Sequence, residues 1–168
     1  MIRTFSGKTP AVSPSAWVSE AAYVIGDVEI GENSSIWPGT VVRGDLGKII
    51  IGKESQVEDN SVIHTANGIT IGDRVHIGHA VVVHCARIGN DVLIGNKAVL
   101  LDNSEIGDNC IISAGSLVSP GSRIPSGSFV SGNPAEVKGK ARPEQLEYLQ
   151  KGIEYYLELT TKYKEQGL

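Results

Sequence analysis

Three of the four histidines in this chain of 168 residues lie close together, in the stretch VHIGHAVVVH from Val75 to His84. The fourth, His64, precedes that stretch. Imidazole nitrogens bind Zn²⁺ and similar metals, and they exchange protons near neutral pH. Whether these rings act together depends on how the chain places His76, His79 and His84 relative to His64.

An aliphatic residue recurs every six positions through most of the chain, and this repeat predicts the fold. Six residues correspond to about 600° of α-helical rotation, so the repeated positions would not line one face of a helix. Three short strands joined by corners close a coil of about 18 residues instead, with neighbouring coils about 4.8 Å apart. We therefore predict a mainly β fold, a parallel β-helix. Its inward residues are Ile30, Ile36, Val42, Ile51, Val57, Ile63, Ile71, Ile77, Val83, Ile88, Ile94, Leu100, Ile106, Ile112, Val118, Ile124 and Val130.

The repeat has a secondary pattern and three irregularities. Glycine often follows the aliphatic residue directly, and a small or β-branched residue commonly stands four places after it. The frame lengthens at GDLGK after Val42 and at HTANG after Ile63, and it shortens between Val83 and Ile88. Insertions in a solenoid become loops at its corners, where functional residues tend to lie.

We expect a single domain with three parts. Residues 1–17 form an N-terminal extension, residues 18–135 the β-helix, and residues 136–168 a linker followed by a C-terminal amphipathic helix. The helix is predicted from an apolar stripe at steps of three and four, which must cover the coil or a neighbouring subunit. The stripe consists of Leu146, Leu149, Ile153, Tyr156, Thr160 and Tyr163.

The six-residue frame assigns each histidine to a column that runs along the coil axis. His64 and His84 each follow an inward residue directly. The 20 positions between them equal one 18-residue coil plus a two-residue insertion, so His84 should lie directly over His64. Arg43 belongs to the same column one coil earlier. Two imidazoles stacked in this way can converge on one metal ion.

His79 belongs to a different column, with Asp59 one coil earlier and Asn96 one coil later. The five-residue step to His84 is about 16 Å long in an extended strand, so His79 should not reach the other two ligands of its own chain. A cyclic trimer would bring His79 of one subunit to the histidine pair of the next. Three histidines would then leave one tetrahedral position for water, as in catalytic zinc sites.

Composition argues against several other functions. The 15 Lys and Arg residues against 19 Asp and Glu give a net charge of −4, so we expect no nucleic-acid partner. Neither a signal peptide nor an apolar run of about 20 residues is evident, so we expect a cytoplasmic protein without a membrane partner. Cys85 and Cys110 should be reduced thiols, with Cys85 packed in the interior.

The chain resembles the γ-class carbonic anhydrase family in SSIWPGTVVRGD, QVEDNSVIH, IGDRVHIGHAVVVHC, the later IG repeats, GNPA and the Tyr-rich final helix. The resemblance implies a left-handed coil and a homotrimer with metal sites at its subunit interfaces. His64, His79 and His84 would bind Zn²⁺, or Fe²⁺ or Co²⁺, with His79 coming from the adjacent subunit. The implied reaction interconverts carbon dioxide and bicarbonate through a metal-bound hydroxide.

The resemblance also implies roles for four neighbouring residues. Arg43 and Asp45 would form an ion pair that orders the pocket, and Asp59 matches the family. Glu58 replaces the usual glutamine, so that a carboxylate would hydrogen-bond the metal-bound water or accept its proton, or else trap a cation and slow turnover. Two further departures are Asn96, where methionine is common, and the loss of the acidic shuttle loop, which is reduced to TANG.

Other readings remain open. Many hexapeptide-repeat proteins are CoA-dependent acyltransferases, which typically need one basic histidine and no metal. A third possibility is a metal-binding trimer without hydratase activity. At the level of single residues, we expect His76 to project outward as an ordinary surface residue and Tyr156 to serve mainly in packing.

Overall fold

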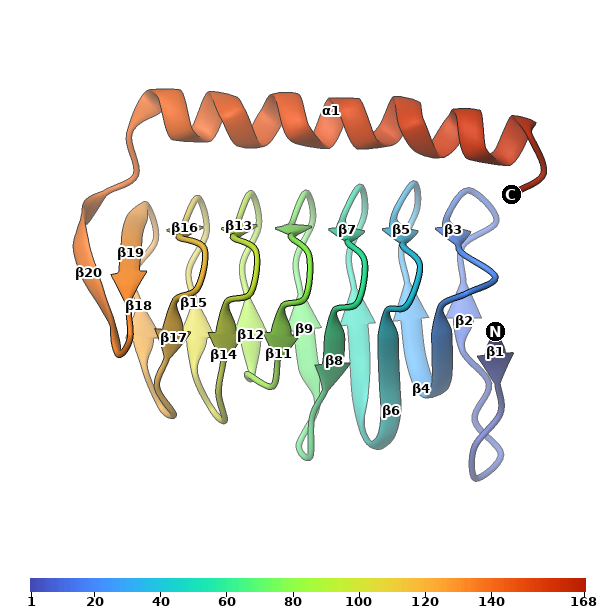
Figure 1. Ribbon diagram of the computed structural model, residues 1–168. Helices are drawn as coiled ribbons and strands as arrows, with labels where there is room; N and C mark the ends of the chain where they lie inside the picture. The colour runs from blue at the N-terminus through green and yellow to red at the C-terminus, as the bar shows by residue number, and fades with distance from the viewer.

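The computed structural model describes residues 1–168 as a stack of coils with one long helix lying along it (Figure 1). The coils run from β1 (Ile2–Arg3) to β20 (Ala135–Lys140), and α1 spans Pro143–Glu165. Each strand pairs in parallel with a strand one coil away, except that β20 is antiparallel to β19 (Ser128–Gly132). The predicted fold class, a left-handed parallel β-helix with a C-terminal α-helix, is confirmed.

The strands form three walls. The second and third walls share the long strands β4 (Tyr23–Ile30) and β6 (Val41–Ile51), which continue from one wall into the next. The first wall contains β3 (Trp17–Val18), β5 (Ser35–Ile36), β7 (Gln56–Val57), β10 (His76–Ile77), β13 (Leu93–Ile94), β16 (Ile111–Ile112), β19 and β20. The second adds β1, β8 (Val62–His64), β11 (Val82–Val83), β14 (Val99–Leu100) and β17 (Leu117–Val118). The third adds β2 (Ala11–Val12), β9 (Ile69–Ile71), β12 (Arg87–Ile88), β15 (Glu105–Ile106) and β18 (Arg123–Ile124).

The inward positions of the hexapeptide frame make up most of the core. All the residues predicted to point inward are buried, and all belong to one cluster of 28 buried apolar residues. They stack in register, with Ile77 between Val57 and Ile94 as an example. The repeat therefore predicted the interior correctly.

The geometry of the corners explains why glycines and small residues recur in the repeat. A Cβ on Gly72 would lie 2.6 Å from the carbonyl oxygen of Gly89 in the next coil, so only glycine allows the coils to approach this closely. The Ser61 hydroxyl donates to the Gly78 carbonyl oxygen at 2.8 Å and accepts from the Val81 amide at 3.0 Å. Such hydroxyls satisfy backbone groups that the turn would otherwise leave without partners.

The first 17 residues, predicted as an extension, continue the β-helix. Residues of β1 pair with Val24 and Ile25, residues of β2 pair with Glu29 and Ile30, and β3 pairs with β5. These pairings place one short strand on each wall, which is the arrangement of a further coil. The aliphatic repeat is too weak in this segment to predict the additional coil from the sequence.

The helix α1 covers the outside of the first wall (Figure 1). It begins at Pro143, and the Arg142 amide donates to Gln145 Oε1 at 2.9 Å, which satisfies a backbone donor at the helix start. Leu149 and Ile153 are buried against Ile111. A helix of this length spans about 34 Å, enough to cross the seven parallel strands of the wall, which at their usual spacing extend about 29 Å.

The outward side chains differ from wall to wall, and we name the walls accordingly. The first wall is the covered face. The second is the valine face, whose outward column consists of Val41, Val62, Val82, Val99 and Leu117. The third is the charged face, with the outward column Glu29, Ile50, Thr70, Arg87, Glu105 and Arg123.

Both cysteines are free and buried, in agreement with the sequence analysis. Burial raises the pKa of the Cys85 thiol to about 12, so this group is an inert part of the core. The helix α1 lacks the long apolar sequence that a membrane-spanning helix requires.

Asp91 connects α1 to a corner of the β-helix. It accepts hydrogen bonds from Nε and Nη2 of Arg74, both at 2.7 Å, and from Nε2 of Gln150 at 3.2 Å. The hydrogen bonds from Arg74 hold the pKa of Asp91 below its ordinary value, although burial acts in the opposite direction. Its φ of 54° is one that asparagine also tolerates.

We expect Asp91→Asn to lower the free energy of unfolding by about 1 kcal/mol at pH 7. A carboxyl whose folded-state pKa is depressed stabilises the fold above its ordinary pKa of 3.8, and this contribution is lost as the pH falls through the folded-state value. Urea unfolding at pH 7 and pH 3 should therefore show a smaller difference from wild type at pH 3. Glu136→Gln is the control, because its ion pair with Lys138 is exposed to solvent and should contribute little to stability at either pH. An equal loss at both pH values would contradict the assignment.

Candidate metal site and the neighbouring carboxylate

His64 and His84 lie side by side at the corner between the valine and charged faces. Val83 pairs with Ile63, so the two histidines that follow are in register. Their ring centroids are 5.2 Å apart, and the ring planes are inclined by 51°. The predicted pairing of these residues across one coil is confirmed, and their role as metal ligands stays a prediction.

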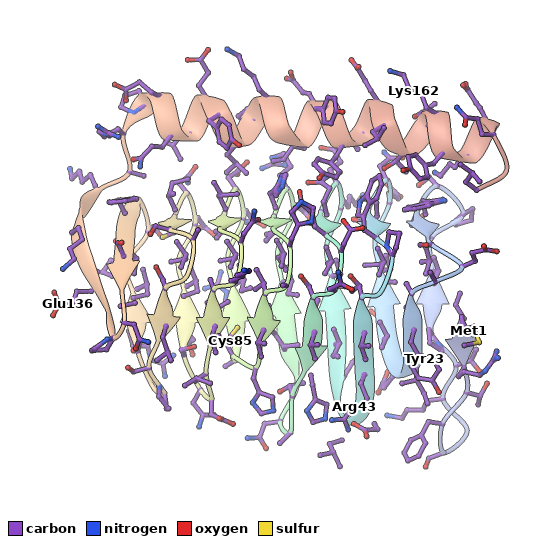
Figure 2. The ribbon with its side chains drawn as sticks, in the orientation of Figure 1. Met1, Tyr23, Arg43, Cys85, Glu136 and Lys162 are labelled. Atoms are coloured by element: carbon purple, nitrogen blue, oxygen red, sulfur yellow. The ribbon has the colours of Figure 1, made fainter.

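Asp45 connects Arg43 to His64. Its Oδ1 lies 3.0 Å from Nε2 of His64, and its Oδ2 lies 2.5 Å from Nη1 of Arg43. Desolvation would raise the pKa of Asp45, but the hydrogen bonds from Arg43 and His64 outweigh it and hold the pKa below its ordinary value. Figure 2 shows Arg43 on the side of the β-helix away from α1. The ion pair expected between Arg43 and Asp45 is present.

His84 has a carboxylate partner that the sequence analysis missed. Its Nδ1 lies 3.1 Å from Oδ1 of Asp102. Asp102 directly follows Leu101, which occupies the column of His84 one coil later. The rings of His64 and His84 each place one nitrogen beside a carboxylate, which leaves the other for a ligand. Histidines that bind metals commonly have this arrangement.

His79 occupies the opposite edge of the valine face, at the corner shared with the covered face. Its Nδ1 lies 3.1 Å from Oδ2 of Asp59, its Nε2 lies 2.9 Å from Oε2 of Glu58, and its amide donates to Oδ1 of Asn96 at 3.0 Å. The column predicted from Asp59 through His79 to Asn96 is therefore present. The side chain is 49% exposed, so the ring is open to a neighbouring molecule.

Glu58 is a buried carboxylate between two histidines, with its side chain only 4% exposed. Its Oε1 lies 2.6 Å from Nε2 of His76, its Oε2 faces His79, and the Tyr156 hydroxyl donates a hydrogen bond to it. Burial alone would raise the pKa of Glu58. The hydrogen bond and charge of His76, the hydrogen bond from Tyr156 and the charge of His79 outweigh burial, so the pKa is lowered. Glu58 is therefore ionised at neutral pH.

The expectation that His76 is an ordinary surface residue is wrong. The residue points outward from the β-helix as the frame predicts, but α1 lies over this wall and leaves it 9% exposed. Tyr156 packs edge-on against both His76 and Trp37, so its expected packing role is present. Burial raises the pKa of the Tyr156 phenol, and its contact with Glu58 raises it further. The frame alone could not reveal these contacts, because it does not specify which wall the helix covers.

The three candidate ligands are divided between the two edges of the valine face. Within the chain, no three His, Cys, Asp or Glu side chains come close enough together to hold a metal ion. His64 and His84 lie at one edge, and His79 lies at the other. The donors suit Zn²⁺, since imidazoles backed by carboxylates are typical zinc ligands. A site with all three histidines would require one edge to meet the opposite edge of another chain.

A groove of about 690 Å³ lies between α1 and the covered face, next to His79. Glu58, His76 and Tyr156 line its polar part, and Leu93 and Ile111 contribute to its apolar part. The groove gives the Glu58 region a path to the surface that passes beneath the helix.

Comparisons with known proteins agree with this architecture. Residues 85–120 match a family model described as bacterial transferase hexapeptide (six repeats). A hexapeptide transferase family protein from Anaplasma phagocytophilum superposes with a TM-score of 0.93 at 37% identity, over 96% of this chain and 97% of that one. A Bacillus cereus protein provisionally named an acetyltransferase superposes with a TM-score of 0.95 at 36% identity, over 98% and 97% of the two chains.

Sequence relatives indicate which group of hexapeptide-repeat proteins the chain resembles in sequence. "Gamma carbonic anhydrase 2, mitochondrial" of Arabidopsis thaliana is 38% identical over 90% of this chain and 58% of its own length. "Carbonic anhydrase" of Geobacillus kaustophilus is 42% identical over 51% of this chain and 48% of its own. The chain belongs to the γ-carbonic anhydrase-like hexapeptide-repeat family. It spans about half the length of these relatives, and the names within the family include both anhydrases and transferases.

Proposed function

We propose that the protein is a metal-dependent enzyme that interconverts carbon dioxide and bicarbonate, acting as a homotrimer with one site at each subunit interface. The observation that supports this most strongly is the division of three carboxylate-backed histidines between the two edges of one wall. The carbonic anhydrase names of the sequence relatives supply the substrate class.

The valine face supports the trimer. The covered face is shielded by α1, and the charged face carries residues suited to solvent, but the valine face presents a continuous apolar column. Val62 and Val82 remain 38% and 37% exposed in the single chain. Three copies that turn this face toward a common axis would bury the column, and they would bring His79 of one copy to His64 and His84 of the next.

His64 and His84 of one subunit and His79 of its neighbour would hold the metal. A divalent ion bound there supplies Lewis-acid activation of water near neutral pH. Asp45 and Asp102 orient the rings of His64 and His84, and Arg43 holds Asp45 in place. Both ring nitrogens of His79 lie beside carboxylates, so His79 would exchange its contact with the more exposed Asp59 for the metal, while the buried Glu58 stays beside its other nitrogen. Glu58, ionised and directed at His79, is the group best placed to accept a proton from water at the site.

An acyl-transfer function is the second candidate, because the Bacillus cereus neighbour bears the name acetyltransferase. A general-base histidine needs a ring nitrogen that can reach substrate. Nε2 of His76 is occupied by Glu58, and its Nδ1 is buried without a partner, so this ring does not meet that requirement. Protection of the folded protein against heat by acetyl-CoA would favour this alternative. A metal-binding trimer without hydratase activity would keep the metal site but show no turnover.

We expect His79→Ala and His84→Ala each to abolish stoichiometric Zn²⁺ binding. Because the ligands come from two subunits, co-expression of the two variants should restore about a quarter of the wild-type metal content in mixed trimers. Metal analysis of the purified proteins measures this directly. If His79→Ala alone keeps full metal content, or the mixture restores none, the interface site is wrong.

We expect Val82→Glu to convert the trimer into monomers, because it would bury three carboxylates near the proposed axis. The fold should tolerate the change, since Val82 is partly exposed in the single chain. Thr70→Glu, at an exposed outward position of the charged face, is the matched control and should remain trimeric. Light scattering coupled to size-exclusion chromatography gives the mass. A Val82→Glu protein that stays trimeric would exclude the valine face from the interface.

We expect metal-reconstituted protein to hydrate carbon dioxide faster than buffer alone in a stopped-flow assay. Glu58→Gln should lower kcat by about tenfold or more, because the amide cannot accept the proton that a general base takes. A rise in kcat would show that the carboxylate impedes turnover. No rate above buffer for either protein would overturn the hydratase assignment and leave the metal-binding trimer.

A further inference from the structure

We infer that His76 is a positioning residue: from beneath α1, it holds the Glu58 carboxylate so that its second oxygen faces His79. The inference rests on the proposed function only in taking His79 as a metal ligand. It concerns a residue outside the set of three ligands and gives the C-terminal helix a part in shaping the site.

The two oxygens of Glu58 have different partners. Oε1 lies 2.6 Å from Nε2 of His76, and Oε2 lies 2.9 Å from Nε2 of His79. A carboxylate that is 4% exposed requires hydrogen-bond donors, because water does not reach it freely. The bond to His76 engages Oε1 and so leaves Oε2 for His79, while the Tyr156 hydroxyl is a further donor to the carboxylate. Without it, the Glu58 side chain could rotate toward the adjoining groove.

His76 is itself held tightly. The Tyr156 ring packs against it edge-on, with ring centroids 5.1 Å apart and planes at 90°. On the helix side, a Cβ on Gly152 would lie only 3.3 Å from Nδ1 of His76, so a glycine in mid-helix lets α1 come this close. The ring is thus confined by Tyr156, by Gly152 and by its bond to Glu58.

Packing alone does not account for a histidine at this position. Nδ1 of His76 is buried without a hydrogen-bond partner, which is unfavourable and would be avoided by an apolar side chain of similar size. Leu93 occupies the equivalent place in the next coil and packs against α1 in this way. What His76 adds to an apolar residue is the Nε2 donor, and its partner is Glu58.

The test compares Co²⁺ binding by wild type, His76→Leu and His76→Gln, followed by visible absorption. Loss of an outer hydrogen-bond partner typically weakens metal binding by about 10- to 100-fold, so we expect a loss of this size and an altered spectrum in His76→Leu. His76→Gln retains an N–H donor and should recover most of the affinity. Gln56→Leu is the matched control, because Gln56 occupies the same column one coil earlier, is buried, and bonds to Glu54 and not to Glu58.

A second measurement does not depend on metal. Crystal structures of metal-free His76→Leu and His76→Gln should show Glu58 turned away from His79 in the first and retained beside it in the second. Wild-type Co²⁺ affinity in His76→Leu, or a Glu58 carboxylate that stays beside His79 in that variant, would overturn the positioning role. Failure of the wild-type protein to bind Co²⁺ would instead contradict the proposed function, and the crystal structures would still decide the role of His76.

Discussion

The in-register stacking of inward aliphatic side chains determines everything else in this molecule. Most strands are two or three residues long, and none could persist alone, so each is stable only through its contacts with the coils on either side. Because inward and outward side chains alternate, a slip of one residue would expose the core column. Deviations from six residues are therefore confined to corners. The insertion after Val42 does not form a loop but lies within β6, where that strand passes from the valine face to the charged face. The insertion after Ile63 lies in a loop, and the shortened repeat lies between β11 and β12.

This constraint explains why much of the site could be predicted from the sequence. A residue's place in the hexapeptide fixes its wall and column, so the pairings of His64 with His84 and of His79 with Asp59 follow from counting. The same reasoning failed where a contact crosses between columns or comes from outside the coils. Asp102 reaches His84 from a neighbouring corner position, and Tyr156 reaches Glu58 from a helix far along the chain. Nothing in the local repeat specifies either contact.

The error over His76 has the same cause. Outward positions are more exposed on the charged face than on the covered face, but the hexapeptide pattern is the same on both. The wall that α1 covers differs from the other two in its larger outward side chains, which include Leu93, Ile111 and Phe129. These side chains form one apolar cluster with Leu149 and Ile153 of the helix. Comparing the outward residues wall by wall, instead of along the chain, would have identified the covered face. It would also have identified the apolar column of the valine face.

The buried carboxylate couples α1 to the metal-ligand edge. Glu58 tolerates burial because His76, Tyr156 and His79 surround it with donors, and Tyr156 belongs to α1. If the helix left the covered face, Glu58 would lose the tyrosine hydroxyl, and water would reach the His76 ring. Conversely, an unpaired carboxylate in this position would oppose docking of the apolar stripe above it. The docking of α1 and the orientation of Glu58 toward His79 therefore stabilise one another, and the packed helix forms part of the candidate site.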